Sequence, residues 1–179
     1  MSDSMKFDIL ANSIIEINTK AGNTAKSAVN QLFTLRNWAI GFYIVEYEQG
    51  GIDRAEYGTN LLKNLEKRIN AKGLNSTLFK WCRQFYLLYP QIGATVSNLF
   101  ELPNFEKSAT ASHEFITNPE LLINNLSFSH IREIMVINDA FERFFYETEC
   151  MNCNWSVREL RRQIKTNLYV RAGISKNPE

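Results

Sequence analysis

The amino-acid sequence predicts an all-α, multi-helix protein with no substantial β-sheet. Apolar residues recur every three or four positions along most of the chain, as they do on one face of a helix. No segment shows the sustained two-residue alternation that is typical of strands. The 179 residues, 45% hydrophobic and 22% charged, can bury one sizeable core. We expect one helical domain over residues 1–179, which can also be read as two helical lobes, at about 5–90 and 119–172, joined by a loop at 91–118.

In the N-terminal half, capping residues and helix breakers first predict two helices. An amphipathic helix is expected at about 5–18, and a second helix runs from a cap at Asn23 to about Glu48, before Gly50-Gly51. Gly41 lies inside the second helix, which indicates either a close contact with another helix or a simple kink. One side of this helix consists of Ala25, Val29, Leu32, Arg36, Ile40, Tyr43 and Tyr47.

Two further helices follow before the expected loop. Asp53 can cap a helix that ends at Ile69, and either Asn75 or Ser76 caps the next helix, which Pro90 ends. The core candidates of the first of these are Leu61, Leu62, Leu65 and Ile69.

In the C-terminal half, Asn118-Pro119 has the pattern of an N-cap followed by proline at the first helical position. Short helices are expected at about 119–125, 128–137 and 139–150. Aromatic residues at helical spacing are expected in the core, namely Trp38, Trp81, Phe85, Tyr86, Phe144, Phe145 and Trp155. His130, at a helix start, can donate a hydrogen bond to a backbone carbonyl or reach a phosphate.

The final helix, expected from Ser156 to about Arg171, combines an apolar stripe with a basic face. Ser156 and Glu159 have the spacing of a capping box. The stripe consists of Leu160, Ile164 and Leu168. Opposite the stripe or on its flank lie the candidate phosphate-binding residues Arg158, Arg161, Arg162 and Lys165. Alternatively, these cations form ion pairs with an acidic segment that contains Asp139, Glu142, Glu147 and Glu149.

Composition excludes several classes of protein. No apolar run approaches the roughly 18 residues that cross a bilayer, and the N-terminus has no signal-peptide core, so we expect a cytoplasmic protein with no membrane partner. Three cysteines, an odd number, argue against a disulfide framework. Cys150 and Cys153 form a single C-x-x-C, but zinc needs further ligands at usable spacing. Reduced thiols, with no metal and no cofactor, are expected.

The formal net charge of +1 conceals a segregation of charge along the chain. Residues 53–90 contain seven Lys or Arg against three acids, residues 91–154 contain three against nine, and residues 155–179 contain six against two. Two basic regions therefore flank an acidic one. A polyanionic partner such as nucleic acid is supported by local charge and not by the overall balance.

Six motifs follow one another along residues 30–176. They are Arg36-Asn37-Trp38-Ala39-Ile40-Gly41 with Ile44-Val45-Glu46-Tyr47-Glu48-Gln49-Gly50, then Asp53-Arg54-Ala55-Glu56-Tyr57-Gly58, Gly73-Leu74 before Arg83-Gln84-Phe85-Tyr86 with Tyr89-Pro90, Leu126-Ser127-Phe128-Ser129-His130, Arg143-Phe144-Phe145-Tyr146, and Trp155-Ser156-Val157-Arg158-Glu159-Leu160. In order and spacing they resemble the N-terminal domain of the YhcG-like endonuclease family. Phe128 stands where the family usually has tryptophan.

Members of that family join such a helical domain to a C-terminal nuclease domain of the PD-(D/E)XK type. The resemblance therefore implies a DNA-related role and a helix-turn-helix-like region. The family would continue into the nuclease beyond Ile174-Ser175-Lys176. No Asp or Glu of this chain is followed two positions later by Lys, so the E-x-K half of that metal site is missing. We expect no catalytic residue and no enzymatic activity of this chain by itself.

A helix, a short turn with Gly73 and a second helix also form the helix-turn-helix pattern, in which the second helix enters the major groove. The alternative is an ordinary αα-hairpin with a solvated charged face. Together with the resemblance, the pattern gives the candidate DNA contacts Lys63, Lys67, Arg68, Asn75, Ser76, Thr77, Lys80, Arg83 and Gln84.

The sequence therefore supports two functional hypotheses. The first is a DNA-binding, targeting module for duplex or branched DNA. The second is a module that forms a homodimer or docks a nuclease domain, in frame or separately encoded, in a nuclease or defence-type complex. The two are compatible, because symmetric proteins commonly bind symmetric half-sites.

Overall fold

The computed structural model describes residues 3–50, 60–97, 99–100, 102 and 117–175, and within these ranges it contains helices and no strand. The predicted all-α class is confirmed. The elements in chain order are α1 Asp3–Gly50, α3 Leu61–Ile69, α4 Ser76–Leu88, the 3₁₀ helix η1 Pro90–Ile92, α5 Gly93–Ser97, α6 Pro119–Asn125, α7 Phe128–Ile134, α8 Ala140–Asn152, α9 Val157–Lys165 and α10 Leu168–Ser175.

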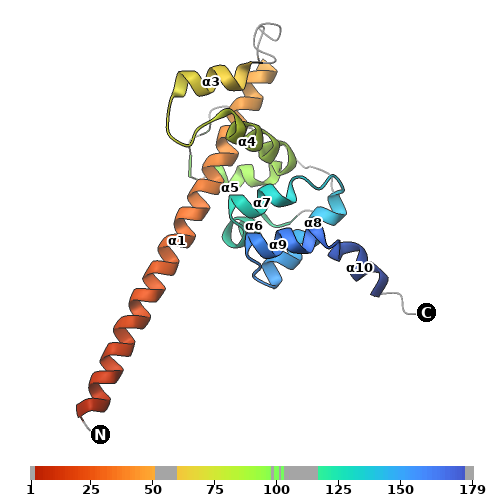
Figure 1. Cartoon of the computed structure of the whole chain (residues 1–179). Helices are drawn as coiled ribbons and strands as arrows, with labels where there is room; N and C mark the ends of the chain where they lie inside the picture. Colours follow the sequence, from red (N-terminus) through yellow and green to blue (C-terminus); the bar gives the residue numbers. More distant parts are fainter. Residues whose placement is uncertain (1–2, 51–59, 98, 101, 103–116, 176–179) are drawn as a thin grey trace.

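Helix α1 is one continuous helix of 48 residues, so the predicted break between residues 18 and 23 is wrong. Asn23 lies within the helix and does not cap it. A single internal glycine, Gly22, costs only about 1 kcal/mol relative to alanine, and the neighbouring alanines favour the helix. The C-terminal half of α1 packs against the other helices, whereas its N-terminal half projects away from them (Figure 1). Residues 7–26 of this arm are exposed, with Ala11 intermediate.

Helices α1 and α4 cross in close contact at Gly41. A Cβ built on Gly41 would lie 2.0 Å from the carbonyl oxygen of Cys82 and 3.0 Å from Cβ of Tyr86. The expected close contact is therefore present at this position. Close approach of the backbones allows the aromatic rings of Phe42 and Tyr86 to meet edge to face, with their centroids 5.7 Å apart.

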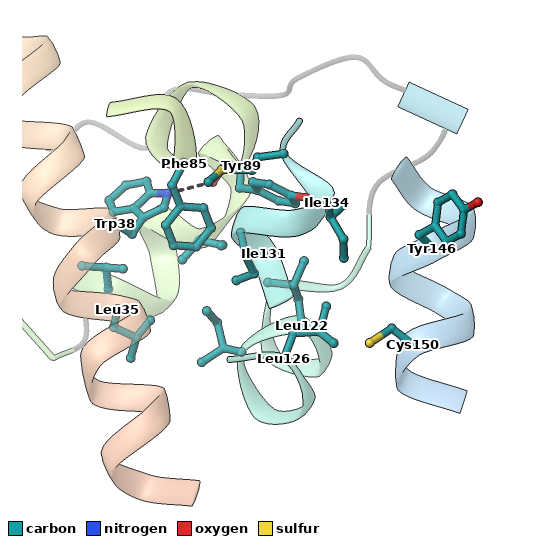
Figure 2. Close-up of a cluster of buried hydrophobic side chains, with 14 of the residues drawn as sticks. Leu35, Trp38, Phe85, Tyr89, Leu122, Leu126, Ile131, Ile134, Tyr146 and Cys150 are labelled. Atoms are coloured by element: carbon teal, nitrogen blue, oxygen red, sulfur yellow. Dashed lines mark hydrogen bonds between the residues drawn. The ribbon is translucent and has the colours of Figure 1, made fainter. Parts of the chain in front are cut away.

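The inner face of α1 belongs to one buried hydrophobic cluster that also includes residues of α4 to α9 (Figure 2). Trp38 is fully buried, and its indole nitrogen donates a hydrogen bond to the carbonyl oxygen of Tyr89 at 2.8 Å. Phe85 is also fully buried, as expected of this core candidate. Other expected core aromatics pack partly buried against the cluster, namely Trp81, Tyr86, Phe145 and Trp155.

A buried carboxylate connects α8 with the end of α4. Glu147 accepts hydrogen bonds from the hydroxyl groups of Tyr89, at 2.6 Å, and of Thr117. Burial raises the pKa of Glu147, and the two hydrogen bonds and the nearby Arg143 act in the opposite direction. The network thus satisfies a group whose burial without partners would be costly.

Most predicted helix starts after residue 70 are confirmed. Asn75 caps α4 by accepting from the backbone N–H of Leu78, and Asn118 caps α6, with Pro119 at its first position. The expected loop at 91–118 is wrong at its beginning, because Ile92 and Val96 of η1 and α5 are buried in the core. Residues 98, 101 and 103–116 of this segment lie outside the described residues.

Two helices differ from their predicted extents. Helix α3 begins at Leu61, with Asn60 at the N-cap position; the expected cap Asp53 lies outside the described residues. The predicted final helix is divided at Asn167, which has a left-handed φ of 56° and separates α9 from α10. Among the described residues, none of the helices combines the length and apolar character needed to span a bilayer.

Replacing Gly41 with alanine should destabilise the fold strongly. The added methyl group would clash with the backbone of α4, and the two helices would have to move apart. We expect the free energy of unfolding to fall by about 3 kcal/mol, at the upper end of overpacking effects, in urea denaturation followed by circular dichroism.

Gly173→Ala is the matched control, because nothing lies within 4 Å of a Cβ at Gly173, which is also in a helix. This variant should be neutral or slightly stabilising. Equal stability of Gly41→Ala and the wild-type protein would contradict the close crossing.

Candidate nucleic-acid interface

Helices α3 and α4 are joined by a tight turn that contains two left-handed residues, Asn70 with a φ of 45° and Gly73 with a φ of 85°. The carboxylate of Glu66 accepts a hydrogen bond from the backbone N–H of Ser76 at 2.9 Å, and this bond lowers the pKa of Glu66. The N-cap Asn75 accepts from another free donor of the first turn of α4. Both Asn75 and Ser76, expected as DNA contacts, therefore make bonds that hold the turn together.

Exposed cations lie on both helices of this hairpin. Lys63 and Lys67 are one helical turn apart on α3, and Lys80 lies one turn after the exposed Thr77 on α4. Arg68 is exposed as well. Among the described residues, none of these four cations forms an ion pair with an acidic side chain. Within the described residues, therefore, no acidic side chain neutralises their charge.

The two remaining candidates on α4 are already engaged within the chain. Arg83 forms an ion pair with Glu48 of α1, with Nε and Oε2 2.7 Å apart. The side-chain amide of Gln84 donates to the carbonyl oxygen of Met135 at 2.9 Å. In addition, α4 turns Phe79, Cys82 and Phe85 towards the core. Only the outer side of α4, with Thr77 and Lys80, faces solvent. In a helix-turn-helix, this is the side of the second helix that would face the DNA groove.

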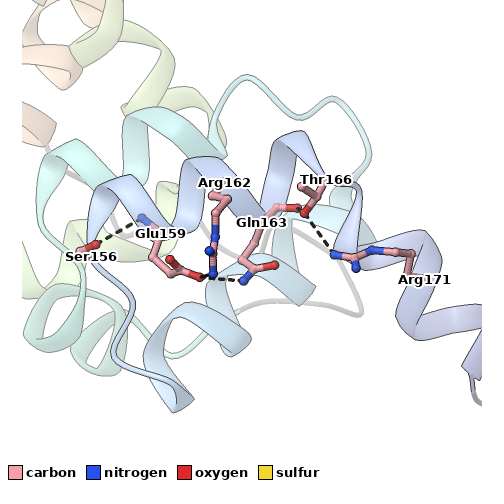
Figure 3. Close-up of polar contacts among 6 residues, drawn as sticks. All are labelled: Ser156, Glu159, Arg162, Gln163, Thr166 and Arg171. Carbon is pink, nitrogen blue, oxygen red and sulfur yellow. Dashed lines mark hydrogen bonds and ion pairs between the residues drawn. The ribbon is translucent and has the colours of Figure 1, made fainter.

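Helix α9 presents four cations, and two of them are paired. Arg161 binds Glu133 of α7 through two hydrogen bonds, of 3.0 and 2.6 Å, which lower the pKa of Glu133. Arg162 binds Glu159 at 2.5 Å within the helix (Figure 3). Arg158 and Lys165 are exposed and have no ion pair among the described residues.

The acidic segment does not pair with α9 in the way the alternative predicted. Asp139 caps α8 by accepting from the backbone N–H of Glu142, and Glu147 is buried with Tyr89. None of the ion pairs among the described residues uses an acid of residues 139–149. Arg161 and Arg162 of α9 pair instead with Glu133 and Glu159.

Sequence reasoning missed Arg132 as a part of this surface. Its guanidinium lies over the ring of Trp81 on α4, 5.0 Å from the centroid. The next residue, Glu133, holds Arg161 of α9. Helix α7 thus connects the exposed side of α4 with α9. The one available signal was a basic residue within an otherwise acidic stretch of sequence.

The described residues contain no cluster of three His, Cys, Asp or Glu side chains that could hold a metal ion. Cys82 and Cys150 are buried, and burial raises the pKa of their thiols to about 12 and about 11. Cys153 is exposed. The C-x-x-C pair is therefore divided between the core and the surface.

Comparison with known proteins identifies the domain. Residues 13–171 match the DUF1016 N-terminal domain. The chain belongs to the DUF1016 N-terminal domain family. It is also 35% identical over 173 residues to the Escherichia coli (strain K12) protein named "Putative nuclease YhcG". The alignment covers 90% of this chain and 45% of that relative. No solved structure matches the chain.

The Leu126-Ser127-Phe128-Ser129-His130 motif of this DUF1016 N-terminal domain positions α9. His130 donates from Nε2 to the carbonyl oxygen of Trp155, the residue before the N-cap of α9, at 3.0 Å. The carbonyl oxygen can only accept, so Nε2 carries a proton. The backbone N–H of Ser127 can only donate, so Nδ1 carries none and accepts from this N–H and from the Ser127 hydroxyl, at 3.2 and 2.8 Å. His130 thus takes the place of the usual Glu in a capping box. It binds a carbonyl, the first of the two roles expected for it.

Protonation of His130 should destabilise the domain. Burial lowers its pKa from the ordinary value of 6.5, although the bond to Trp155 acts in the opposite direction. Above about pH 6.5 the side chain is neutral in both the folded and the unfolded state. Below that pH the unfolded chain takes up a proton first, so the stability that depends on neutral His130 is lost as the pH falls.

We expect the stability difference between the wild-type protein and His130→Gln to shrink from pH 7.5 to pH 5.5, as measured by urea denaturation. Comparing the two proteins at each pH cancels the contribution of Glu147, whose raised pKa acts in the opposite direction. A difference that stayed constant or grew over this range would contradict the neutral tautomer.

Proposed function

We propose that this DUF1016 N-terminal domain is a DNA-binding, targeting module that is non-catalytic by itself. The observation that carries the proposal is the set of exposed cations on α3 and α4. Lys63, Lys67, Arg68 and Lys80 are exposed and free of acidic partners among the described residues. The relative's printed name describes a nuclease, and a nuclease acts on nucleic acid.

The chemistry of these residues favours phosphate as the ligand. Flexible ammonium groups bind phosphates as point charges, and their contacts release counterions from the DNA. Thr77, one turn before Lys80, adds a hydroxyl that suits a phosphate or a base edge. Arg83 and Gln84 have intrachain partners, so we assign them a supporting role in holding α4.

Helix α9 supplies a second group of contacts under this proposal. Arg158 and Lys165 are directly available. Arg161 and Arg162 are mostly exposed despite their ion pairs, and exposed ion pairs contribute little net free energy. A phosphate can therefore replace Glu133 or Glu159 as their partner. The sequence-independent part of the affinity would correspond to a Kd on the order of 10⁻⁴–10⁻⁶ M at physiological salt.

Under this proposal, the described residues do not cleave DNA. Their side chains form no metal-binding cluster, and the sequence has no acid followed two positions later by lysine. The chain spans less than half the length of its curated relative. A nuclease domain, in frame or separately encoded, is the partner that a targeting module would serve. The alternative assembly role concerns mainly the outer face of α1 and is compatible with DNA binding.

Binding to duplex and branched DNA should weaken steeply as salt increases. In a fluorescence anisotropy titration across a salt series, the double variant Lys63→Gln, Lys67→Gln should weaken binding to all sequences similarly. It should also reduce the slope of log K against log salt by about 2, which corresponds to about 0.9 per lost phosphate contact.

The double variant Lys20→Gln, Lys26→Gln is the matched control, because it removes the same charge from exposed positions on the projecting arm. It should leave affinity and slope nearly unchanged. Undetectable binding at 50 mM salt, or equal effects of the two double variants, would refute the proposed interface.

Glu133→Gln tests α9 separately. The substitution releases Arg161 and removes a negative charge beside it, so binding should become several-fold tighter at low salt. Thermal denaturation should confirm that the variant remains folded. Unchanged or weaker DNA binding by the folded variant would exclude Arg161 from the interface.

A further inference from the structure

The outer face of α1 carries a long apolar stripe that nothing in the described chain covers. Nine large apolar side chains on this face are about 48–69% exposed. They are Phe7, Leu10, Ile14, Ile15, Val29, Leu32, Phe33, Tyr43 and Tyr47. At 3.6 residues per turn they share one side of the helix. This outer stripe runs from the projecting arm into the packed half.

The outer stripe lies opposite the face that builds the core. Trp38, Phe42 and Val45 are buried against α4 and its neighbours, whereas Leu32, Tyr43 and Tyr47 point the other way. The sequence periodicity had placed Val29, Leu32, Tyr43 and Tyr47 on one side, and that side is the exposed one. A helix that is apolar on two faces needs a partner on each of them.

The size of the outer stripe fits a protein partner. Together its side chains expose on the order of 800 Å² per chain, about the share that one partner contributes to a stable interface. The arm also gains little support within the chain, because residues 7–26 are exposed. A helix of this kind owes most of its stability to packing of its apolar face.

The charges of the arm argue against a membrane surface. Asp8 and Glu16 balance Lys20 and Lys26, whereas helices that lie on membranes are rich in Lys and Arg on their polar face. Because the charges of the arm balance, two copies of the helix can meet without net repulsion.

The packed end of the outer stripe opens into an apolar groove of about 590 Å³ between α1 and α3. Ile40, Tyr43 and Tyr47 line it from α1, and Leu61 and Leu65 line it from α3. Three of the four core candidates of α3, namely Leu61, Leu65 and Ile69, therefore line an open groove, and no residue of α3 is fully buried. The groove has room for bulky apolar side chains from outside the described chain.

We propose that the outer stripe is the interface of an antiparallel homodimer, in which the arm of each copy lies along the packed half of α1 of the other copy and reaches its groove. Pairing centred on Ala25 places Phe7 opposite Tyr43 and Leu10 opposite Ile40. The arm is long enough to reach the groove of the other copy, because Phe7 and Tyr43 each lie 18 residues from Ala25, on opposite sides of it.

The middle of the helix suits the close crossing that this pairing needs. Ala21, Gly22, Ala25 and Ala28 lie around the proposed two-fold axis. No atom of the described chain lies within 4 Å of a Cβ built on Gly22, so its packing within the chain gives no reason for a glycine there. A parallel pair would instead bring both α3 helices to the same end of the dimer and leave both grooves unfilled.

Sedimentation equilibrium of the full chain should detect a dimer that dissociates on dilution. Ile14→Glu should raise the dissociation constant at least about tenfold, because a carboxylate would be buried in apolar surface. Ile9→Glu is the matched control, since Ile9 is similarly exposed, at 53% against 57%, but lies on the polar side of the same helix. It should leave dimerisation unchanged.

Orientation is tested by crosslinking in a Cys153→Ser background, which removes the exposed thiol. A mixture of Phe7→Cys and Tyr43→Cys chains should form a crosslinked heterodimer with a short bismaleimide, and Phe7→Cys alone should not.

A monomer at high micromolar concentration would overturn the proposal, as would a dimer that Ile14→Glu leaves intact. Efficient Phe7 to Phe7 crosslinking would overturn the antiparallel arrangement. Binding of the monomer to neutral or anionic vesicles, abolished by Ile14→Glu, would assign the outer stripe to a membrane and also overturn the dimer. DNA binding is measured separately and can fail without affecting these outcomes.

Discussion

The crossing of α1 and α4 at Gly41 is the contact on which the rest of the packing depends. Because the backbones approach so closely there, Trp38 can reach the carbonyl oxygen of Tyr89 beyond the end of α4. Tyr89 in turn donates to the buried Glu147 of α8, and Gln84 of α4 holds the end of α7. One close contact between two helices thus fixes where the following helices pack. A bulkier residue at the crossing would disturb all of these bonds together.

Ion pairing decides which cations of the domain are available to a partner. Counted along the sequence, the basic residues of α3, α4 and α9 look equivalent. In the structure, Arg83 and Arg161 have acidic partners from distant elements, whereas Lys63, Lys67 and Lys80 have none among the described residues. Under the proposed function, DNA would therefore bind mainly at the α3–α4 hairpin. Arg161 and Arg162 of α9 would contribute only where a phosphate replaced their acidic partners.

Features that depend on neighbouring residues, such as helix caps, could be predicted from the sequence. Contacts between residues far apart along the chain could not. The Asn75 cap, Asn118-Pro119 and the Ser156 cap act within one helical turn, and all three are present. The motifs in order also gave the family, because their spacing constrains many positions at once. The buried side of α1 could not be inferred, since both of its faces are apolar. Neither could the partners of Arg83 and Arg161, which lie 35 and 28 residues away along the chain.

The fold and the proposed dimer together give α1 two roles, with its inner face in the core of the domain and its outer stripe in the dimer. Hydrogen exchange of the α1 amides at two protein concentrations tests this most directly. We expect amides of residues 7–26 to be protected at high concentration and to exchange rapidly on dilution, while those of residues 34–45 stay protected at both concentrations. Rapid exchange of residues 7–26 at both concentrations, or protection that dilution does not change, would contradict it.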